Sequence, residues 1–270
     1  MMRACIQSQV NYLDITGEIK VFELAQSLSA EAKAAGIVLC PGVGFDVVPT
    51  DCVAMKLKET LPDATELSLG FDSRAGFSPG TFKTSIEGLA QGGKIRKNGE
   101  ITTVKLAFEV KQINFGDGHK QAMTIPWGDV ATAYHTTGIP NVRTYVPAPS
   151  GLVRLSKFMN FIKPLLGLSS VQNFLKSQVD KRVKGPTEEE RATLPTFVWG
   201  HARNANGQSA TVRIKTAHPY GLTIDSAVAM ATSLVKRNDV AGAYTPAKLM
   251  GSGFVEQLPG SGTMSVEVSR

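Results

Sequence analysis

Hydrophobic and polar positions follow two different patterns along the chain, and the change comes near residue 62. Before it, strands are predicted at "NYLDITGE" (11–18) and "IVLC" (37–40), which are short and apolar. Helices are predicted over "VFELAQSLSAEAKAAG" (21–36), which Gly36 terminates, and over about 50–61. The order strand, helix, strand, helix predicts a βαβ unit with parallel strands.

After residue 62 the pattern is typical of an antiparallel sheet. Short β-rich strands are predicted at "TELSLGF" (65–71), "TTVKLAFEV" (102–110), "AMTIPW" (122–127), "VRTYV" (142–146), "TFVWGHA" (196–202) and "ATVRIKTA" (210–217). "RKNG" (96–99) and "RNANGQ" (203–208) predict hairpins. Helices are predicted at about 80–92, 151–184 and 223–237, with a turn and short helix after residue 244.

The predicted fold class is therefore α/β plus α+β. A βαβ region over residues 1–62 precedes an α+β domain over 63–270, a mostly antiparallel mixed sheet with helices. We expect residues 241–270 to pack back on the first region.

Composition excludes several classes of protein. With 42% hydrophobic and 19% charged residues, the chain is typical of a globular protein, and it has no apolar run of about 18 residues. Its start lacks the apolar core of a signal peptide, so we expect a cytoplasmic protein. Neither the cysteines nor the histidines show metal-ligand spacing, and we expect buried thiols and no metal: Cys5, Cys40, Cys52, His119, His135, His201 and His218.

The net charge of +6 lies in one segment. Residues 152–186 hold seven basic side chains and only Asp180 as an acid, so the rest of the chain is neutral and no nucleic-acid partner is expected. The segment mixes these charges with Leu, Phe, Met and Ile. Two interpretations stay open: a helix pair that covers the sheet, and an amphipathic surface for an anionic membrane or a lipid-like substrate.

Glycine motifs and acidic residues supply the candidate chemistry. "GVGFDV" (42–47) lacks the third glycine of the dinucleotide fingerprint, because Val47 stands in its place, and a tight strand-to-helix turn is the simpler interpretation. Asp14, Glu18, Asp46 and Asp51 follow the two predicted parallel strands, whose carboxyl ends meet at one edge. Glu18 and Asp46 are candidates to donate a proton or orient a substrate. Alternatively, Asp14 and Asp46 accept from turn amides and Asp51 caps its helix.

Four stretches resemble the saccharopine dehydrogenase-like oxidoreductases in their order and spacing: "NYLDITGE" (11–18), "PGVGFDVVPTDCVA" (41–54), "SPGTFKTSIE" (78–87) and "TPAKLMGSGFVEQLPGSG" (245–262). Within that family the chain is similar to the branch of the trans-acting enoyl reductases, which "GDVATAYHTTGIPNVRTYV" (128–146) and "AHPYGLT" (217–223) also fit. In the family, the first of these stretches is a late strand of a Rossmann domain. The segment with the Gly-rich nucleotide turn comes before it, and this sequence does not contain that segment, so residues 1–62 are expected to be a remnant of that domain in a truncated chain.

The resemblance implies hydride transfer between NADP or NAD and a small or lipid-like substrate. It assigns cofactor binding to Asp14, Thr16, Gly17 and Gly44, and catalysis to Glu18, Asp46 and Tyr220. It also implies a homo-oligomer or a partner that carries the missing Rossmann half. Without a nucleotide turn we expect the chain to be inactive alone. The alternatives are a non-catalytic binding protein and one half of a split enzyme.

Overall fold

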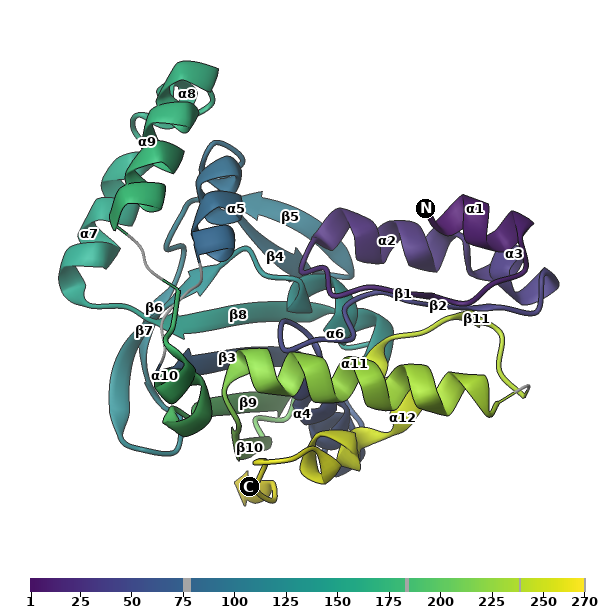
Figure 1. The fold of residues 1–270 in the computed structure, drawn as a ribbon. Coiled ribbons are helices and arrows are strands. Elements are labelled where there is room, and N and C mark those ends of the chain that lie inside the picture. The colour runs from purple at the N-terminus through teal and green to yellow at the C-terminus, as the bar shows by residue number, and fades with distance from the viewer. Residues whose placement is uncertain (75–78, 183–184, 238, 270) are drawn as a thin grey trace.

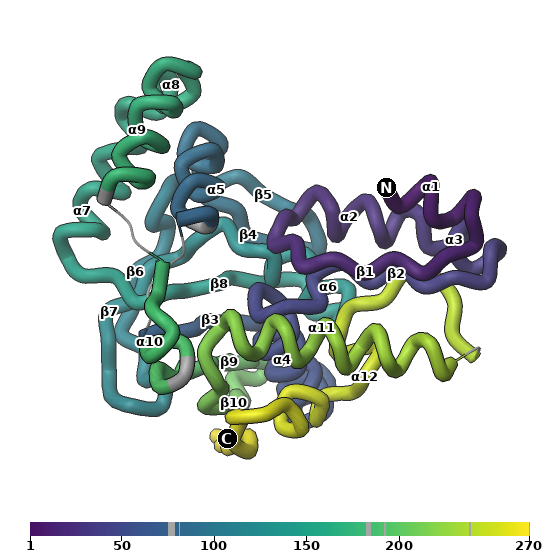
Figure 2. The backbone as a smooth tube through the Cα atoms, viewed as in Figure 1, coloured from purple at the N-terminus to yellow at the C-terminus, as the bar shows by residue number. Residues whose placement is uncertain are grey.

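The computed structural model describes residues 1–74, 79–182, 185–237 and 239–269, whose strands form two sheets (Figure 1). The smaller sheet has the order β1 (Tyr12–Leu13), β2 (Val38–Cys40), β11 (Gly242–Ala243), and both pairs are parallel. Helices α1 (Met2–Gln7), α2 (Ile19–Ser27) and α3 (Ser29–Ala34) lie on one side of it, and α11 (Pro219–Val235) lies on the other. Figure 2 shows that β11 returns from the far end of the chain to lie beside β2.

Both faces of β2 are buried, as a parallel strand requires. Leu39 packs with Ala25 and Ala32 under α2 and α3. Val38, which points to the opposite face, packs with Met230 of α11. The alternation of these side chains explains why a fully apolar stretch forms the central strand of the smaller sheet.

The larger sheet has the order β12, β10, β9, β3, β8, β4, β5, and β7 of the β6–β7 hairpin also pairs with β8. Its strands are β3 (Ala64–Ser73), β4 (Gly93–Lys97), β5 (Glu100–Val104), β6 (Val110–Asn114), β7 (His119–Ile125), β8 (Asn141–Pro147), β9 (Thr196–Asn204), β10 (Ser209–Thr216) and β12 (Ser265–Ser269). Only β3 and β8 pair in parallel among the described strands of this sheet. The parallel and antiparallel sheets confirm the predicted mixture of α/β and α+β architecture.

Helix α4 (Val48–Thr60) joins the two sheets into one core. Its Val53 and Leu57 pack on the larger sheet over Leu69 and Gly200. A Cβ atom on Gly200 would lie 2.5 Å from Val53 Cγ1 and 2.7 Å from Leu57 Cδ1, so the helix can come this close only over a glycine. Helix α6 (Asp129–Thr137) packs beside α4.

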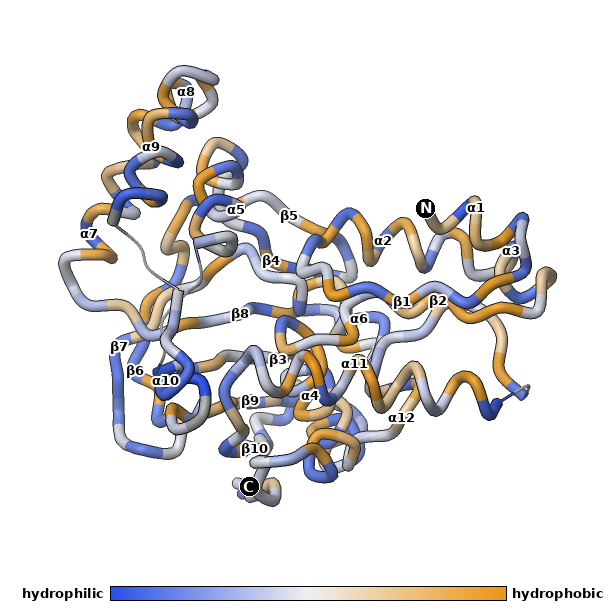
Figure 3. The backbone as a smooth tube through the Cα atoms, viewed as in Figure 1, coloured by the Kyte–Doolittle hydropathy of each residue, from blue (hydrophilic) through white to orange (hydrophobic). Residues whose placement is uncertain are grey.

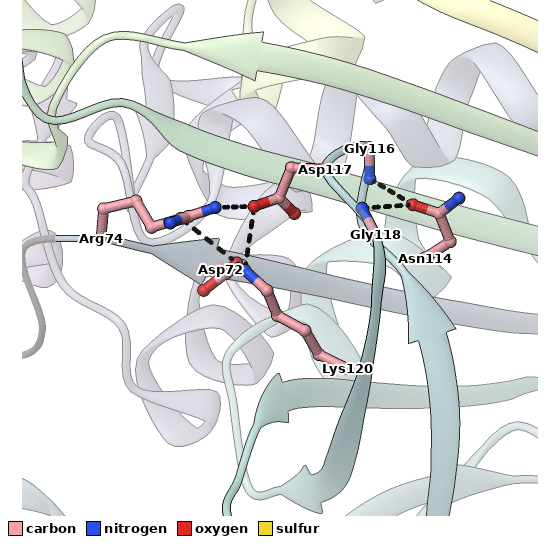
Figure 4. Close-up of polar contacts among 7 residues, drawn as sticks. All are labelled: Asp72, Arg74, Asn114, Gly116, Asp117, Gly118 and Lys120. Atoms are coloured by element: carbon pink, nitrogen blue, oxygen red, sulfur yellow. Dashed lines mark hydrogen bonds and ion pairs between the residues drawn. The ribbon is translucent and has the colours of Figure 1, made fainter.

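The opposite face of the larger sheet is covered by the β6–β7 hairpin, whose turn is held by charges (Figure 4). Arg74 and Lys120 both pair with Asp72 and with Asp117. Asn114 accepts from the turn amides, at 3.0 Å from the N–H of Gly116 and 3.3 Å from that of Gly118. These contacts fix the hairpin turn to the end of β3.

Three helices stand away from the sheets as an arm, α7 (Ser150–Met159), α8 (Lys163–Leu166) and α9 (Ser169–Arg182), with α8 at its tip (Figure 1). Helix α5 (Pro79–Leu89) packs against α9. The remaining elements are α10 (Glu188–Thr193), α12 (Pro246–Met250) and the 3₁₀ helix η1 (Ser252–Gln257). No helix in the described ranges is both long and apolar enough to cross a bilayer.

Several predicted boundaries are wrong for local reasons. The helix predicted at 21–36 is two helices that meet at Leu28, and "TTVKLAFEV" is two strands because Ala107 adopts a positive φ of 50°. The helix predicted from 223 begins at Pro219, since the His218 side chain accepts from the Tyr220 N–H and caps it. Residue 78, within the third quoted stretch, and residue 184, within the basic segment, lie outside the described residues.

Candidate functional site

The turn that follows β1 is organised by the Asp14 carboxylate. Asp14 accepts from the Tyr12 phenol at 2.5 Å, from the Thr16 N–H at 3.0 Å and from the Gly42 N–H at 3.0 Å. Burial, followed by this carboxylate, raises the pKa of Tyr12. The alternative interpretation of Asp14, as an acceptor of turn amides, is therefore confirmed, and the same contacts tie the turn after β1 to the turn after β2.

The turn after β2 is clamped to the first half of α11. The Thr223 hydroxyl accepts from the Phe45 N–H at 3.0 Å, and the Ser226 hydroxyl donates to the Val43 carbonyl at 2.6 Å. A Cβ on Gly44 would lie 2.9 Å from Thr223 Cγ2, so this position requires glycine. The carboxyl ends of β1 and β2 and the start of α11 therefore form one rigid edge.

Gly17 and Asp46 meet at this edge. A Cβ on Gly17 would lie 3.0 Å from Asp46 Oδ2, and the Trp127 indole donates to the Asp46 carbonyl at 3.0 Å. Burial raises the pKa of the Asp46 carboxyl to about 6. No turn amide among the described residues donates to this carboxylate, so the alternative interpretation of Asp46 as an acceptor of turn amides is not supported.

Two further carboxyls, Asp51 and Asp129, are fully buried behind the edge. Asp51 does not cap its own helix as proposed from the sequence: it accepts from the Thr136 hydroxyl and, at 2.8 Å, from the Ala247 N–H. Burial raises its pKa to about 6. Asp129 accepts from the Thr50 hydroxyl at 2.6 Å, and burial raises its pKa to about 8. At neutral pH Asp129 is therefore protonated.

The remaining two catalytic candidates lie at the rim. Glu18 is exposed at the start of α2, and its N–H donates to the Thr16 hydroxyl at 3.2 Å. Tyr220 is 40% exposed in the first turn of α11, one helical turn before Thr223. Its ring lies 5.5 Å from the His218 ring and 5.1 Å from the Arg191 guanidinium. Burial lowers the pKa of His218, the neighbour of Tyr220.

The structure thus brings together Asp14, Thr16, Gly17, Gly44 and Asp46, with Glu18 and Tyr220 at their margin. Their roles stay predictions. Sequence reasoning missed the side chains that hold this edge from distant elements, Thr223, Ser226, Trp127, Thr136 and Asp129. None of them belongs to a motif that follows the two parallel strands.

A dinucleotide needs an open glycine cradle for its pyrophosphate, and Gly42 and Gly44 of the turn after β2 do not form one. A Cβ on Gly42 would lie 2.8 Å from the Phe22 ring and 2.7 Å from Val47, so protein atoms already fill the space above this glycine. The space above Gly44 is filled by Thr223. The turn after β2 therefore fits the pyrophosphate of NAD or NADP poorly.

Comparison with known proteins is informative for the fold. No protein-family model matches the chain, and no match was found among curated proteins. Among solved structures, the apo, histidine-tagged saccharopine dehydrogenase (L-Glu forming) from Saccharomyces cerevisiae is similar with a TM-score of 0.54 and 12% identity. The similarity covers 100% of this chain and 82% of the yeast chain. At this identity it shows a common fold, which agrees with the resemblance found in the sequence.

Proposed function

We propose that this chain is the carboxy-terminal part of a saccharopine dehydrogenase-like oxidoreductase. In the complete enzyme a hydride passes between NADP or NAD and a small or lipid-like substrate, and this chain supplies the nicotinamide edge and the substrate cleft. The yeast neighbour supports an oxidoreductase-like fold. The proposal includes inactivity of this chain alone, because Gly42 and Gly44 do not form a pyrophosphate cradle.

The proposal rests on the order and the direction of the strands in the smaller sheet. A dinucleotide-binding sheet has the strand order 3-2-1-4-5-6, with its ligand at the carboxyl ends around strands 1 and 4. The three strands of the smaller sheet are parallel in the order β1, β2, β11, and in our proposal they are strands 4, 5 and 6 of such a sheet. Within the described residues the outer edge of β1 is unpaired, and there strand 1, with the Gly-rich turn, would add.

The residues at this edge suit the nicotinamide end of such a cofactor. Gly17 brings the backbone of the β1 turn close to Asp46 without a side chain between them. Asp46, whose pKa is about 6, is the best candidate to take up or release the proton that accompanies hydride transfer. Glu18 and Tyr220, both accessible at the rim, are candidates to orient the substrate.

Two other functions remain in competition. One half of a split enzyme would use the same β1 edge to bind a separately encoded nucleotide-binding chain. A non-catalytic binding protein would bind its ligand at the edge around Asp46 without NADPH. The three proposed functions predict different results when the chain is mixed with a separate unit that carries strands 1–3 of the sheet.

The test is to mix the chain with a nucleotide-binding half, a unit of strands 1–3 that bears the Gly-rich turn. We expect NADPH to bind the mixture and neither piece alone, measured by calorimetry. The variant Gly17→Val, whose side chain enters the space beside Asp46 Oδ2, is expected to abolish binding by the mixture. The variant Gly151→Val, at a glycine with open space around it, is the matched control. Absence of binding by the mixture contradicts the oxidoreductase proposal and favours the binding protein.

A further inference from the structure

The arm of α7, α8 and α9 exposes half of its large apolar side chains to solvent. Each of its helices has one buried apolar residue: Val153, Leu166 and Val179. Seven large apolar side chains of the arm are exposed: Leu152, Leu155, Phe158, Phe161, Leu165, Leu168 and Phe174. Phe161 is 84% exposed, more than any other phenylalanine among the described residues. Burial within the chain therefore does not explain the composition of the arm.

Six of these side chains follow one another along α7 and the segment around α8. Leu152, Leu155 and Phe158 are spaced by three residues, which places them along one side of α7. Phe161, Leu165 and Leu168 continue the surface around α8, at the tip of the arm (Figure 1). We call these six residues the arm surface. Figure 3 shows hydrophobic and hydrophilic residues interleaved along this part of the chain.

Unpaired positive charges border the arm surface. Arg154, Lys157 and Lys181 are exposed and have no ion-pair partner within the described part of the chain. Two charges of α9 are paired: Lys176 pairs with Glu87 at 2.5 Å and Asp180 pairs with Lys83 at 2.6 Å. Both of these pairs join α9 to α5. The pairing therefore neutralises the inner side of the arm and leaves the α7 side cationic.

The arm is anchored, so its apolar side is presented in a fixed direction. The Asn160 side chain, at the end of α7, accepts from the Leu106 N–H at 2.8 Å and donates to the Leu106 carbonyl at 3.2 Å. Helix α9 is held by the two ion pairs to α5. These contacts use the inward sides of the helices and leave the arm surface uncovered in the described structure.

We propose that the arm surface binds the surface of an anionic lipid bilayer. Phe161, Leu165 and Leu168 insert between the headgroups, where apolar side chains on a short helix gain burial without spanning the bilayer. Arg154 and Lys157 lie beside them and meet the phosphates of anionic lipids, which attract basic residues within a Debye length. Charge complementarity selects a bilayer over a second copy of the chain, because two arm surfaces would oppose positive charges. This inference does not depend on the proposed function.

Co-sedimentation with vesicles tests the proposal. We expect the wild-type chain to bind phosphatidylcholine vesicles that contain 30% phosphatidylserine and to bind pure phosphatidylcholine at least tenfold more weakly. The triple variant R154Q/K157Q/K181Q is expected to lower binding to the anionic vesicles by roughly a hundredfold. The control K33Q/K97Q/K215Q removes three exposed lysines from other faces and is expected to change binding by less than threefold.

A second pair of variants tests insertion. The double variant F161S/L165S is expected to lose binding, whereas I224S/V228S, which removes two exposed apolar side chains of α11, is expected to retain it. Phe161→Trp should show a blue-shifted emission with anionic vesicles and quenching by brominated lipid. Circular dichroism of each variant establishes that it is folded.

Three results would overturn the proposal. The first is equal binding, or none, to anionic and neutral vesicles. The second is an equal loss of vesicle binding in R154Q/K157Q/K181Q and in the control K33Q/K97Q/K215Q, because the net charge of the protein then explains the binding. The third is a concentration-dependent dimer in which the indole introduced by Phe161→Trp is shielded without lipid, because the arm surface is then an interface between copies.

Discussion

Replacing Asp129 by Asn is expected to stabilise the protein at neutral pH and to have little effect below pH 4. Asp129 is fully buried, and burial raises the pKa of its carboxyl from 3.8 to about 8. Between these values the unfolded chain has lost the proton and the folded chain still holds it. Rising pH therefore favours the unfolded state throughout this interval, and stability is highest below it.

The magnitude follows from the two pKa values. At about 1.4 kcal/mol per pH unit, the buried carboxyl lowers the free energy of unfolding at pH 7 by about 4 kcal/mol relative to its protonated form. Asn has no proton to lose and keeps the shape of the carboxyl. Its oxygen accepts from the Thr50 hydroxyl, and its amide replaces Oδ2, a buried atom without a hydrogen-bond partner among the described residues.

Urea unfolding of both proteins at pH 5, 6, 7 and 8, followed by tryptophan fluorescence, measures the effect. The difference in free energy of unfolding, variant minus wild type, is expected to grow by about 1.4 kcal/mol for each pH unit from pH 5 to pH 7, and by less from pH 7 to pH 8, where the folded carboxyl begins to lose its proton. Glu31→Gln, on the exposed side of α3, controls for the loss of one negative charge. A difference that stays constant from pH 5 to pH 8 would refute the assignment of a protonated Asp129.

Three further substitutions test the contacts that hold the site. Gly44→Ala should lower the free energy of unfolding by about 1–3 kcal/mol because the new Cβ meets Thr223 Cγ2. In a Thr223→Ser background, which removes Cγ2 and keeps the hydroxyl, the same substitution should cost much less, and additive costs would contradict this contact. Thr136→Val should cost about 1–3 kcal/mol, more at pH 7 than at pH 5, because it removes a donor from the Asp51 carboxylate; urea unfolding at both pH values measures it. Asp72→Asn should cost about 2 kcal/mol and speed amide exchange in the β6–β7 turn; unchanged exchange there would show that the turn is held by Asn114 alone.

The local part of the fold could be predicted from the sequence. The stretch 37–40 is apolar at every position, and it forms the strand whose two faces are both buried. Asn98 and Gly99 adopt the positive φ values, 51° and 83°, that the "NG" dipeptide allows in a hairpin. Pro164 and Gly167, within the predicted 151–184 helix, lie at the bend between α7 and α9.

The long-range part could not be predicted, because its signals are short or lie in other elements. Strand β11 consists of Gly242 and Ala243 alone, and only its pairing with β2 makes it a strand. The strand-end rule, applied to Asp14, Glu18, Asp46 and Asp51, correctly placed Asp14 and Asp46 at one edge with Glu18 at its rim, but Asp51 lies buried behind that edge. It gave no information on Thr223, which contacts the same turn from a helix 178 residues further along the chain.

We propose that the edge around Gly17, Gly44 and Asp46 holds the nicotinamide end of a dinucleotide. The most direct measurement is a titration of the isotope-labelled chain with reduced nicotinamide mononucleotide and, separately, with ADP-ribose, followed by amide chemical shifts. We expect millimolar binding of the mononucleotide, with amide chemical-shift changes at Thr16, Gly17 and Gly44, and no chemical-shift changes with ADP-ribose. Shifts elsewhere, no shifts with either compound, or micromolar binding of ADP-ribose would contradict it.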